Sequence, residues 1–140
     1  MSCDFCTITE APQTHILYED EATAAFFPHY PATPGHTLLI PRAHITDIYG
    51  LDRHAAESLA RSTLVLAKAI RAALLPEGLN VITSSGTAAS QSVFHLHIHL
   101  VPRWTNDRIG NIWPPKQDLN VNIEDDLADR IRREIDNTTA

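Results

Sequence analysis

Residues 93–101 read Val93-Phe-His95-Leu-His97-Ile-His99-Leu-Val101, and histidine alternates with apolar residues along this segment. A period of two residues is that of a β-strand, whereas a helix repeats every three to four. One face of the strand is therefore expected to pack on the core through Leu96, Ile98 and Leu100. The three histidines are expected on the other face, with successive imidazoles about 6–7 Å apart.

The three imidazoles are costly to charge on a central strand, so burial and mutual repulsion are expected to keep them largely neutral. A neutral imidazole offers one nitrogen lone pair to a metal ion or to an electrophile. Histidines at every second residue rarely converge on one tetrahedral ion. The pattern therefore favours nucleophilic catalysis, in which His97 attacks while His95 and His99 orient it and neutralise charge. The alternative is the polar outer face of a half-buried strand.

A run of small and hydroxyl-bearing residues leads into this strand: Ser84-Ser-Gly-Thr-Ala-Ala-Ser90-Gln91-Ser92. Small residues let backbone N–H groups approach an anion closely, and Ser and Gln side chains add neutral donors. Beside the histidines the run is typical of an oxyanion cradle, although alone it would also fit a flexible polar hairpin.

The composition indicates a globular protein with one domain, expected to span residues 1–140. Hydrophobic residues make up 44% of the chain and charged residues 20%, which excludes a disordered chain. The net charge of −6 disfavours nucleic acid as a partner, and apolar runs such as 64–67 are too short to cross a membrane. With only two cysteines and no signal-peptide pattern, a cytoplasmic location is expected.

Short apolar runs bounded by turn residues predict four further strands, at 15–18, 22–27, 36–40 and 80–83. Asp52 is expected to cap a long helix, and Pro76 and Gly78 to end it. A charged segment near the C-terminus predicts an amphipathic helix, because apolar residues recur in it every four positions: Leu127, Ile131 and Ile135. These elements give an α+β domain with about five strands, one long helix and a C-terminal helix.

Neither period fits residues 102–124, which contain both tryptophans, Trp104 and Trp113. A stretch of this length without regular structure is more often a functional loop or a partner contact. The alternative is a loop that packs its aromatic side chains on the domain. We expect a core over about residues 3–104, followed by a loop and helix over 105–140.

The motif of residues 95–101 resembles the signature of the histidine-triad (HIT) family, in which three histidines alternate with hydrophobic residues. The flanking segments agree with that family, and so does a segment upstream: Gln91-Ser92-Val93-Phe94, Pro102-Arg103-Trp104 and Thr33-Pro-Gly-His36-Thr-Leu-Leu-Ile-Pro-Arg-Ala-His44. The resemblance covers about residues 3–104. It implies a HIT-like antiparallel sheet, a homodimer formed through a continuous sheet and the long helix, and hydrolysis or transfer of nucleotides by attack at the α-phosphorus.

Position by position, the resemblance makes His97 the nucleophile that forms a nucleotidyl-histidine intermediate on a purine nucleotide or related nucleoside phosphate. His99 would contact the α-phosphate, and His95 would hold the geometry of the triad. Gln91 would hydrogen-bond the phosphate, and Ser92 would assist the leaving group. No catalytic metal is implied.

Other positions complete the candidate substrate site. Phe26 matches a family aromatic residue beside the base, although a lone Phe is more often core. Trp113 resembles a residue near the active site of the neighbouring subunit. Three positions depart from the family pattern. Pro28 stands where many members have a ribose-binding Asp, Ser90 stands in place of a Gly, and Ser84 stands in place of an Asn. Pro28 and Ser90 leave open, as an alternative, a nucleotide-binding, zinc-stabilised interaction module with little turnover.

The N-terminal Cys3-Asp-Phe-Cys6 is a C-x-x-C, and a redox role would require a strand before it and a helix opening at it, neither of which is expected. The pair is half of a metal site or two buried thiols that anchor the N-terminus. The resemblance supplies His44 and His95 as further ligands, which implies structural zinc in a Cys₂His₂ set. The remaining histidines are expected on the surface or in loops: His15, His29, His36 and His54.

Overall fold

The computed structural model describes residues 2–10, 16–118 and 121–139. Its internal contacts divide the chain into two units, one ending at Gly110 and the other beginning at Asn111. The first unit contains the sheet and every described candidate site residue except Trp113. One domain over residues 1–140 stays a prediction.

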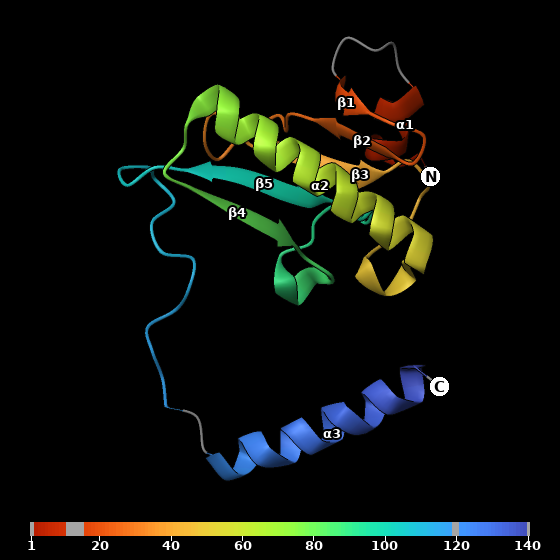
Figure 1. The fold of residues 1–140 in the computed structure, drawn as a ribbon, viewed down its shortest axis with the longest axis vertical. Coiled ribbons are helices and arrows are strands. Elements are labelled where there is room, and N and C mark those ends of the chain that lie inside the picture. Colours follow the sequence, from red (N-terminus) through yellow and green to blue (C-terminus); the bar gives the residue numbers. More distant parts are fainter. Residues whose placement is uncertain (1, 11–15, 119–120, 140) are drawn as a thin grey trace. The chain divides into compact units, whose positions relative to one another are not determined.

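Five strands form one sheet in the first unit (Figure 1). The strands are β1 (Ile16–Glu19), β2 (Thr23–Phe26), β3 (Thr37–Pro41), β4 (Gly78–Thr83) and β5 (Ile98–Arg103). Their order is β1-β2-β3-β5-β4, and each neighbouring pair is antiparallel. The predicted α+β class, with about five strands in an antiparallel sheet, is confirmed.

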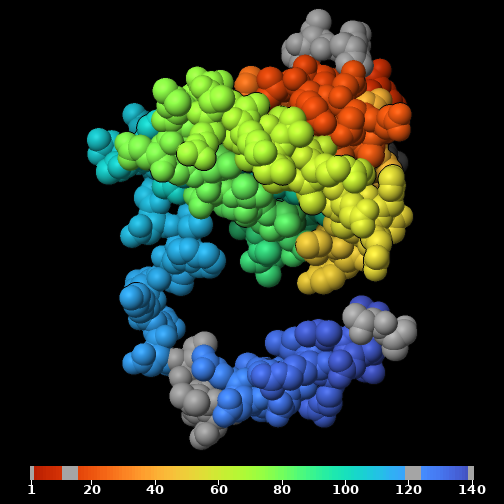
Figure 2. Space-filling view, in the orientation of Figure 1, coloured from red at the N-terminus to blue at the C-terminus, as the bar shows by residue number. Residues whose placement is uncertain are grey.

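The long helix α2 (Arg53–Leu74) crosses one face of this sheet (Figures 1 and 2). It begins where predicted, because the Asp52 carboxylate accepts a hydrogen bond of 2.8 Å from the Ala55 N–H and so satisfies a donor of the first turn. Its inner face is apolar and packs on buried residues of the sheet and of the segment before β5, and the resulting core cluster contains Ala25, Leu39, Leu59, Leu66, Ile70, Leu96 and Leu100. The expected core-facing role of Leu96 and Leu100 is confirmed.

A second apolar cluster includes the alternate side chains of β2 and β3, together with Phe5: Phe5, Ala24, Phe26, Leu38 and Ile40. Neighbouring residues of a strand point to opposite faces, so β2 and β3 are covered on both sides. Phe5 belongs to a short helix, α1 (Asp4–Glu10), that the sequence does not predict. The expectation that no helix opens at the C-x-x-C is therefore wrong, although no strand precedes Cys3 in the described chain.

The strand β5 starts five residues later than its alternating pattern predicts, at Ile98 in place of Val93. In the segment before β5, side chains hydrogen-bond to backbone carbonyl groups that would otherwise accept hydrogen bonds from a neighbouring strand. The His97 ring nitrogen Nδ1 donates to His95 O over 2.8 Å, and the Thr83 hydroxyl donates to His97 O over 2.9 Å. On the facing strand, Pro41 has no N–H with which to extend the pairing. Only His99 of the three histidines therefore lies within a strand.

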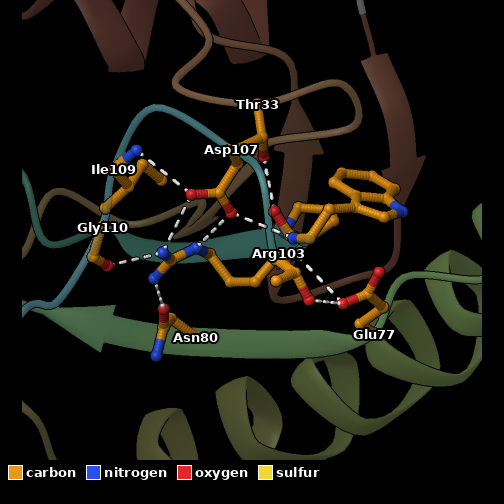
Figure 3. A network of polar contacts seen from close by, with 10 residues as sticks. Thr33, Glu77, Asn80, Arg103, Asp107, Ile109 and Gly110 are labelled. Carbon is orange, nitrogen blue, oxygen red and sulfur yellow. Dashed lines mark hydrogen bonds and ion pairs between the residues drawn. The ribbon is translucent and has the colours of Figure 1, made fainter.

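Residues 103–110 form a turn after β5, which we call the Arg103 turn (Figure 3). The Arg103 guanidinium donates to both carboxylate oxygens of Asp107, to Asn80 Oδ1 on β4 and to Gly110 O. Asp107 also accepts from the backbone N–H groups of Trp104 and Ile109. These contacts hold the chain at the point where the first unit ends.

The second unit consists of an exposed segment over 111–118 and helix α3 (Val121–Thr139), which confirms the predicted C-terminal helix. Trp113 lies in the exposed segment, and the apolar residues at four-residue spacing on α3 are also exposed. Two short 3-10 turns, Ile48–Gly50 and Thr87–Ala89, complete the elements of the described chain. Over the residues described, no helix combines the length and apolar character needed to span a bilayer.

Candidate functional site

Four side chains from three separate segments meet at one end of the sheet: Cys3, Cys6, His44 and His95. Their potential ligand atoms all lie within 4.8 Å of one another. The His95 Nδ1 atom lies 3.5 Å from the sulfur of each cysteine, and His44 Nδ1 lies 3.4 Å from Cys6 Sγ. On a tetrahedron with Zn–S of about 2.3 Å and Zn–N of about 2.0–2.1 Å, a sulfur and a nitrogen are about 3.5 Å apart. The donor set and its spacing fit zinc.

The backbone prepares His95 for this role. Its Nε2 atom lies 2.8 Å from Pro41 O, and because a carbonyl can only accept, Nε2 carries the proton. The lone pair of the neutral ring is then on Nδ1, the atom that faces the two cysteines. Burial, together with neighbouring His44 and His97, lowers the pKa of His95 and favours the neutral form. Burial and then the adjacent Cys3 raise the pKa of Cys6, and a bound cation would oppose this shift.

A backbone carbonyl also fixes the position of the proton on His97, but here the protonated atom is Nδ1 rather than Nε2. Nδ1 donates to His95 O, so the neutral ring has its lone pair on Nε2. Within the described chain, Nε2 of His97 has no hydrogen-bond partner. Every fully buried side-chain nitrogen of the described residues does have a partner, so Nε2 is not fully buried and reaches solvent. The site thus presents one nucleophilic nitrogen on a ring that is otherwise buried, with 8% of His97 exposed.

His99 is held by a fourth imidazole, that of His36. The Ala32 N–H donates to His36 Nδ1 over 3.0 Å, so the neutral His36 carries its proton on Nε2. That atom lies 2.9 Å from His99 Nδ1 and donates to it, which leaves the proton of His99 on Nε2 as a donor. Burial, and then the nearby His97 and His36, lower the pKa of His99 to about 4, so the ring is neutral near pH 7.

His36 lies in the loop before β3, which is one of its two expected placements, but it is not on the surface, because its side chain is buried and bonded within the site. We call His36, His95, His97 and His99 the histidine row. Sequence reasoning also missed Phe5, which packs against two of these rings. The sequence around His36 and Phe5 does not indicate a role in the site, because their partners are distant in the chain. His99 is 63 residues from His36, and His97 is 92 residues from Phe5.

The loop before the row is organised by Gln91, whose side chain is buried. Its amide donates to Thr46 O and Val93 O, and its carbonyl accepts from the Gly86 N–H over 2.7 Å. The amide group is thus engaged within the loop, and a phosphate contact for Gln91 stays a prediction. Ser90, which stands where the family has Gly, adopts a left-handed conformation with φ of 71°.

The remaining predicted residues lie in different surroundings. Ser84 is half-buried beside this loop, and Ser92 is exposed. Phe26 belongs to the apolar cluster with Phe5, whereas Trp113 is in the second unit. Of the histidines expected on the surface or in loops, His29 and His54 are exposed. His15 lies outside the described residues.

Comparisons with known proteins show which family and fold the chain resembles. The family model "HIT domain" matches residues 9–106. A crystal structure of a HIT family member from Bacillus subtilis is 34% identical, with a TM-score of 0.85 over 95% of this chain and 96% of that one. A Zn-bound histidine triad family protein from Mycobacterium smegmatis is 32% identical, with a TM-score of 0.67 over 99% and 98%. The adenosine 5'-monophosphoramidase hnt1 of Schizosaccharomyces pombe is 32% identical over 116 residues, covering 81% of this chain and 84% of that protein.

Proposed function

This chain belongs to the HIT domain family, and from that premise we propose that it is a nucleotide hydrolase or nucleotidyltransferase acting through His97. The observation that carries the proposal is the hydrogen bond from His97 Nδ1 to His95 O, which leaves an accessible lone pair on Nε2. Nucleophilic catalysis needs such a lone pair on a ring whose orientation is fixed before attack.

In the first step, His97 Nε2 attacks the α-phosphorus of a nucleoside phosphate ester or phosphoramidate. A P–N bond forms as the bond to the leaving group breaks, and the leaving group takes up a proton with assistance from the Ser92 hydroxyl. Water then attacks the nucleotidyl-histidine, releases a proton and returns the electron pair to Nε2. The neutral His99, with its proton on Nε2, would donate to a phosphate oxygen and stabilise the charge that develops there.

The relative named adenosine 5'-monophosphoramidase supports the choice of substrate class. We take a purine nucleotide, or a related nucleoside phosphate, as the substrate. Phe26 and Trp113 remain candidate contacts to it, and so do Ser84, Ser90 and Gln91. Zinc would be structural, held by the Cys₂His₂ set, because it would occupy His95 Nδ1 and leave His97 free. A cytoplasmic homodimer without a nucleic-acid or membrane partner completes the proposal.

Mass spectrometry after rapid mixing with an adenosine phosphoramidate tests the proposal. Wild-type protein is expected to gain the mass of one adenylyl group, and His97→Ala is expected to gain none. His54→Ala, which changes an exposed histidine on α2, is the matched control and should form the adduct. Nucleotide binding without an adduct or turnover in the wild type would support the alternative of an interaction module and contradict the enzyme.

A further inference from the structure

Phe5 occupies an unusual place in the chain, between the two cysteines of the C-x-x-C. It is the one buried residue of helix α1, with 8% of its surface exposed. The cysteines on either side of it face His95 and His44. The turn that carries Phe5 is therefore attached at both ends to the predicted metal cluster.

The Phe5 ring contacts the histidine row directly. Its centroid lies 5.2 Å from that of His97, and the two rings are nearly perpendicular, at 85°. It also lies 6.0 Å from the ring of His95 and 5.3 Å from that of Phe26, both at 67°. Perpendicular contacts at these separations are favourable aromatic geometries, so Phe5 fills the space beside His97 with a flat and directional surface.

His97 needs a second constraint besides its hydrogen bond. The bond to His95 O fixes one edge of the imidazole, but the torsion that turns such a ring is broad and roughly two-fold. Turning the ring over exchanges Nδ1 with a carbon, breaks that bond and withdraws Nε2 from its position. A packed ring perpendicular to the imidazole opposes this rotation.

We propose that Phe5 is a positioning residue for His97, held in place by helix α1 through the cysteines on either side of it. This inference deepens the proposed function and rests on it, because the position of Nε2 matters for attack on phosphorus. It also gives the metal cluster a second role. An ion held by Cys3 and Cys6 would fix the turn that carries Phe5, and the state of the cluster would then affect His97 as well as His95.

The test compares Phe5→Leu with Ile8→Ala in the zinc-loaded chain of residues 1–140. Phe5→Leu keeps an apolar side chain and removes the flat ring. Ile8→Ala truncates another α1 residue that packs on the same apolar cluster. Three quantities are measured: the maximal rate of adduct formation in single turnover, the Kd for adenosine monophosphate, and the fraction of His97 with its proton on Nδ1, from ¹H–¹⁵N NMR at one fixed pH. Zinc content is measured in parallel.

Phe5→Leu is expected to slow adduct formation by about tenfold, since small displacements of a reacting group cost one to two orders of magnitude. Its Kd and zinc content should equal those of the wild type, and the Nδ1-protonated fraction of His97 should fall. Ile8→Ala should change none of these. Phe5→Met serves as a second variant if the leucine variant does not fold.

Two results for a folded Phe5 variant, Phe5→Leu or Phe5→Met, would overturn the inference. One is a raised Kd with an unchanged rate, as expected if Phe5 contacts only substrate, and the other is an unchanged His97 tautomer. The NMR readout does not depend on turnover. A wild-type protein that forms no adduct would therefore contradict the proposed function, while the effect of Phe5 on His97 could still be observed.

Discussion

The first unit contains two polar centres, the histidine row and the Arg103 turn, and they are built in opposite ways. In the row, neutral rings donate to carbonyls or to each other, and burial lowers the pKa of His99 to about 4. In the turn, the Arg103 guanidinium donates to Asp107 and holds the pKa of that carboxyl well below its usual range. Neutral rings leave lone pairs and N–H groups for chemistry, whereas the ion pair uses its groups to hold the chain (Figure 3).

Loss of the proposed zinc, which would share His95 with the row, is expected to have the largest effect on either centre. At zinc concentrations a thousand times its Kd, binding to the folded state alone stabilises a protein by about 4 kcal/mol. Cys6→Ser should therefore lower both the zinc content and the melting temperature, and a chelator should reproduce the loss in the wild type. Thr9→Ser, a change on the same helix outside the cluster, is the control. Equal zinc content in Cys6→Ser and wild type would remove the metal from the account.

A change within the row that spares the metal should affect the rate of reaction more than stability. His36→Ala removes the donor to His99 Nδ1, so the proton of His99 is no longer directed to Nε2. We expect adduct formation to slow by about ten- to a hundredfold. Complete loss of a stabilising or proton-transferring group costs roughly 10²–10⁴-fold, but this variant keeps His99 and only stops directing its proton. Stopped-flow measurements on His36→Ala and His54→Ala provide the comparison. Equal rates in the two variants would show that the fourth imidazole does not orient His99.

The smallest expected effect concerns how the free energy of unfolding changes with pH. This dependence distinguishes the histidine row from the Arg103 turn. The folded-state pKa of His99, about 4, lies below its ordinary value of 6.5, so between these values the unfolded chain binds more protons and stability falls as the pH is lowered. Asp107 also has a depressed pKa, but its contribution is present above about pH 4 and is lost in stronger acid. Thermal unfolding should show that His99→Gln flattens the first range and Asp107→Asn the second. Identical profiles for the two variants would contradict the assignment.

The sequence predicted those parts of the fold that depend on local periodicity and capping. Helix α2 begins at its Asp52 cap, and the core contains Leu96 and Leu100 as the alternation requires. The start of β5 was misplaced because alternation does not reveal which carbonyls the side chains will occupy. Helix α1 was missed because seven residues do not form a stable helix alone, and packing of Phe5 supports it.

The candidate site divides in the same way. Alternation and the resemblance selected His95, His97 and His99. The C-x-x-C spacing selected the two cysteines, and the resemblance added His44 and His95 to them; the structure brings the ligand atoms of these four residues within 4.8 Å of one another. His36 escaped because a single histidine before a strand is no different from a surface residue until the fold places it beside His99. Gln91 shows the reverse case, since its predicted phosphate contact competes with three hydrogen bonds inside its own loop.

The most direct measurement is the position of the adenylyl group on the trapped intermediate, read by tandem mass spectrometry and by NMR coupling between phosphorus and ring nitrogen. The account predicts one phosphorus–nitrogen bond, at Nε2 of His97, with Nδ1 still protonated. A group attached to any other residue, or to Nδ1 of His97, would contradict it.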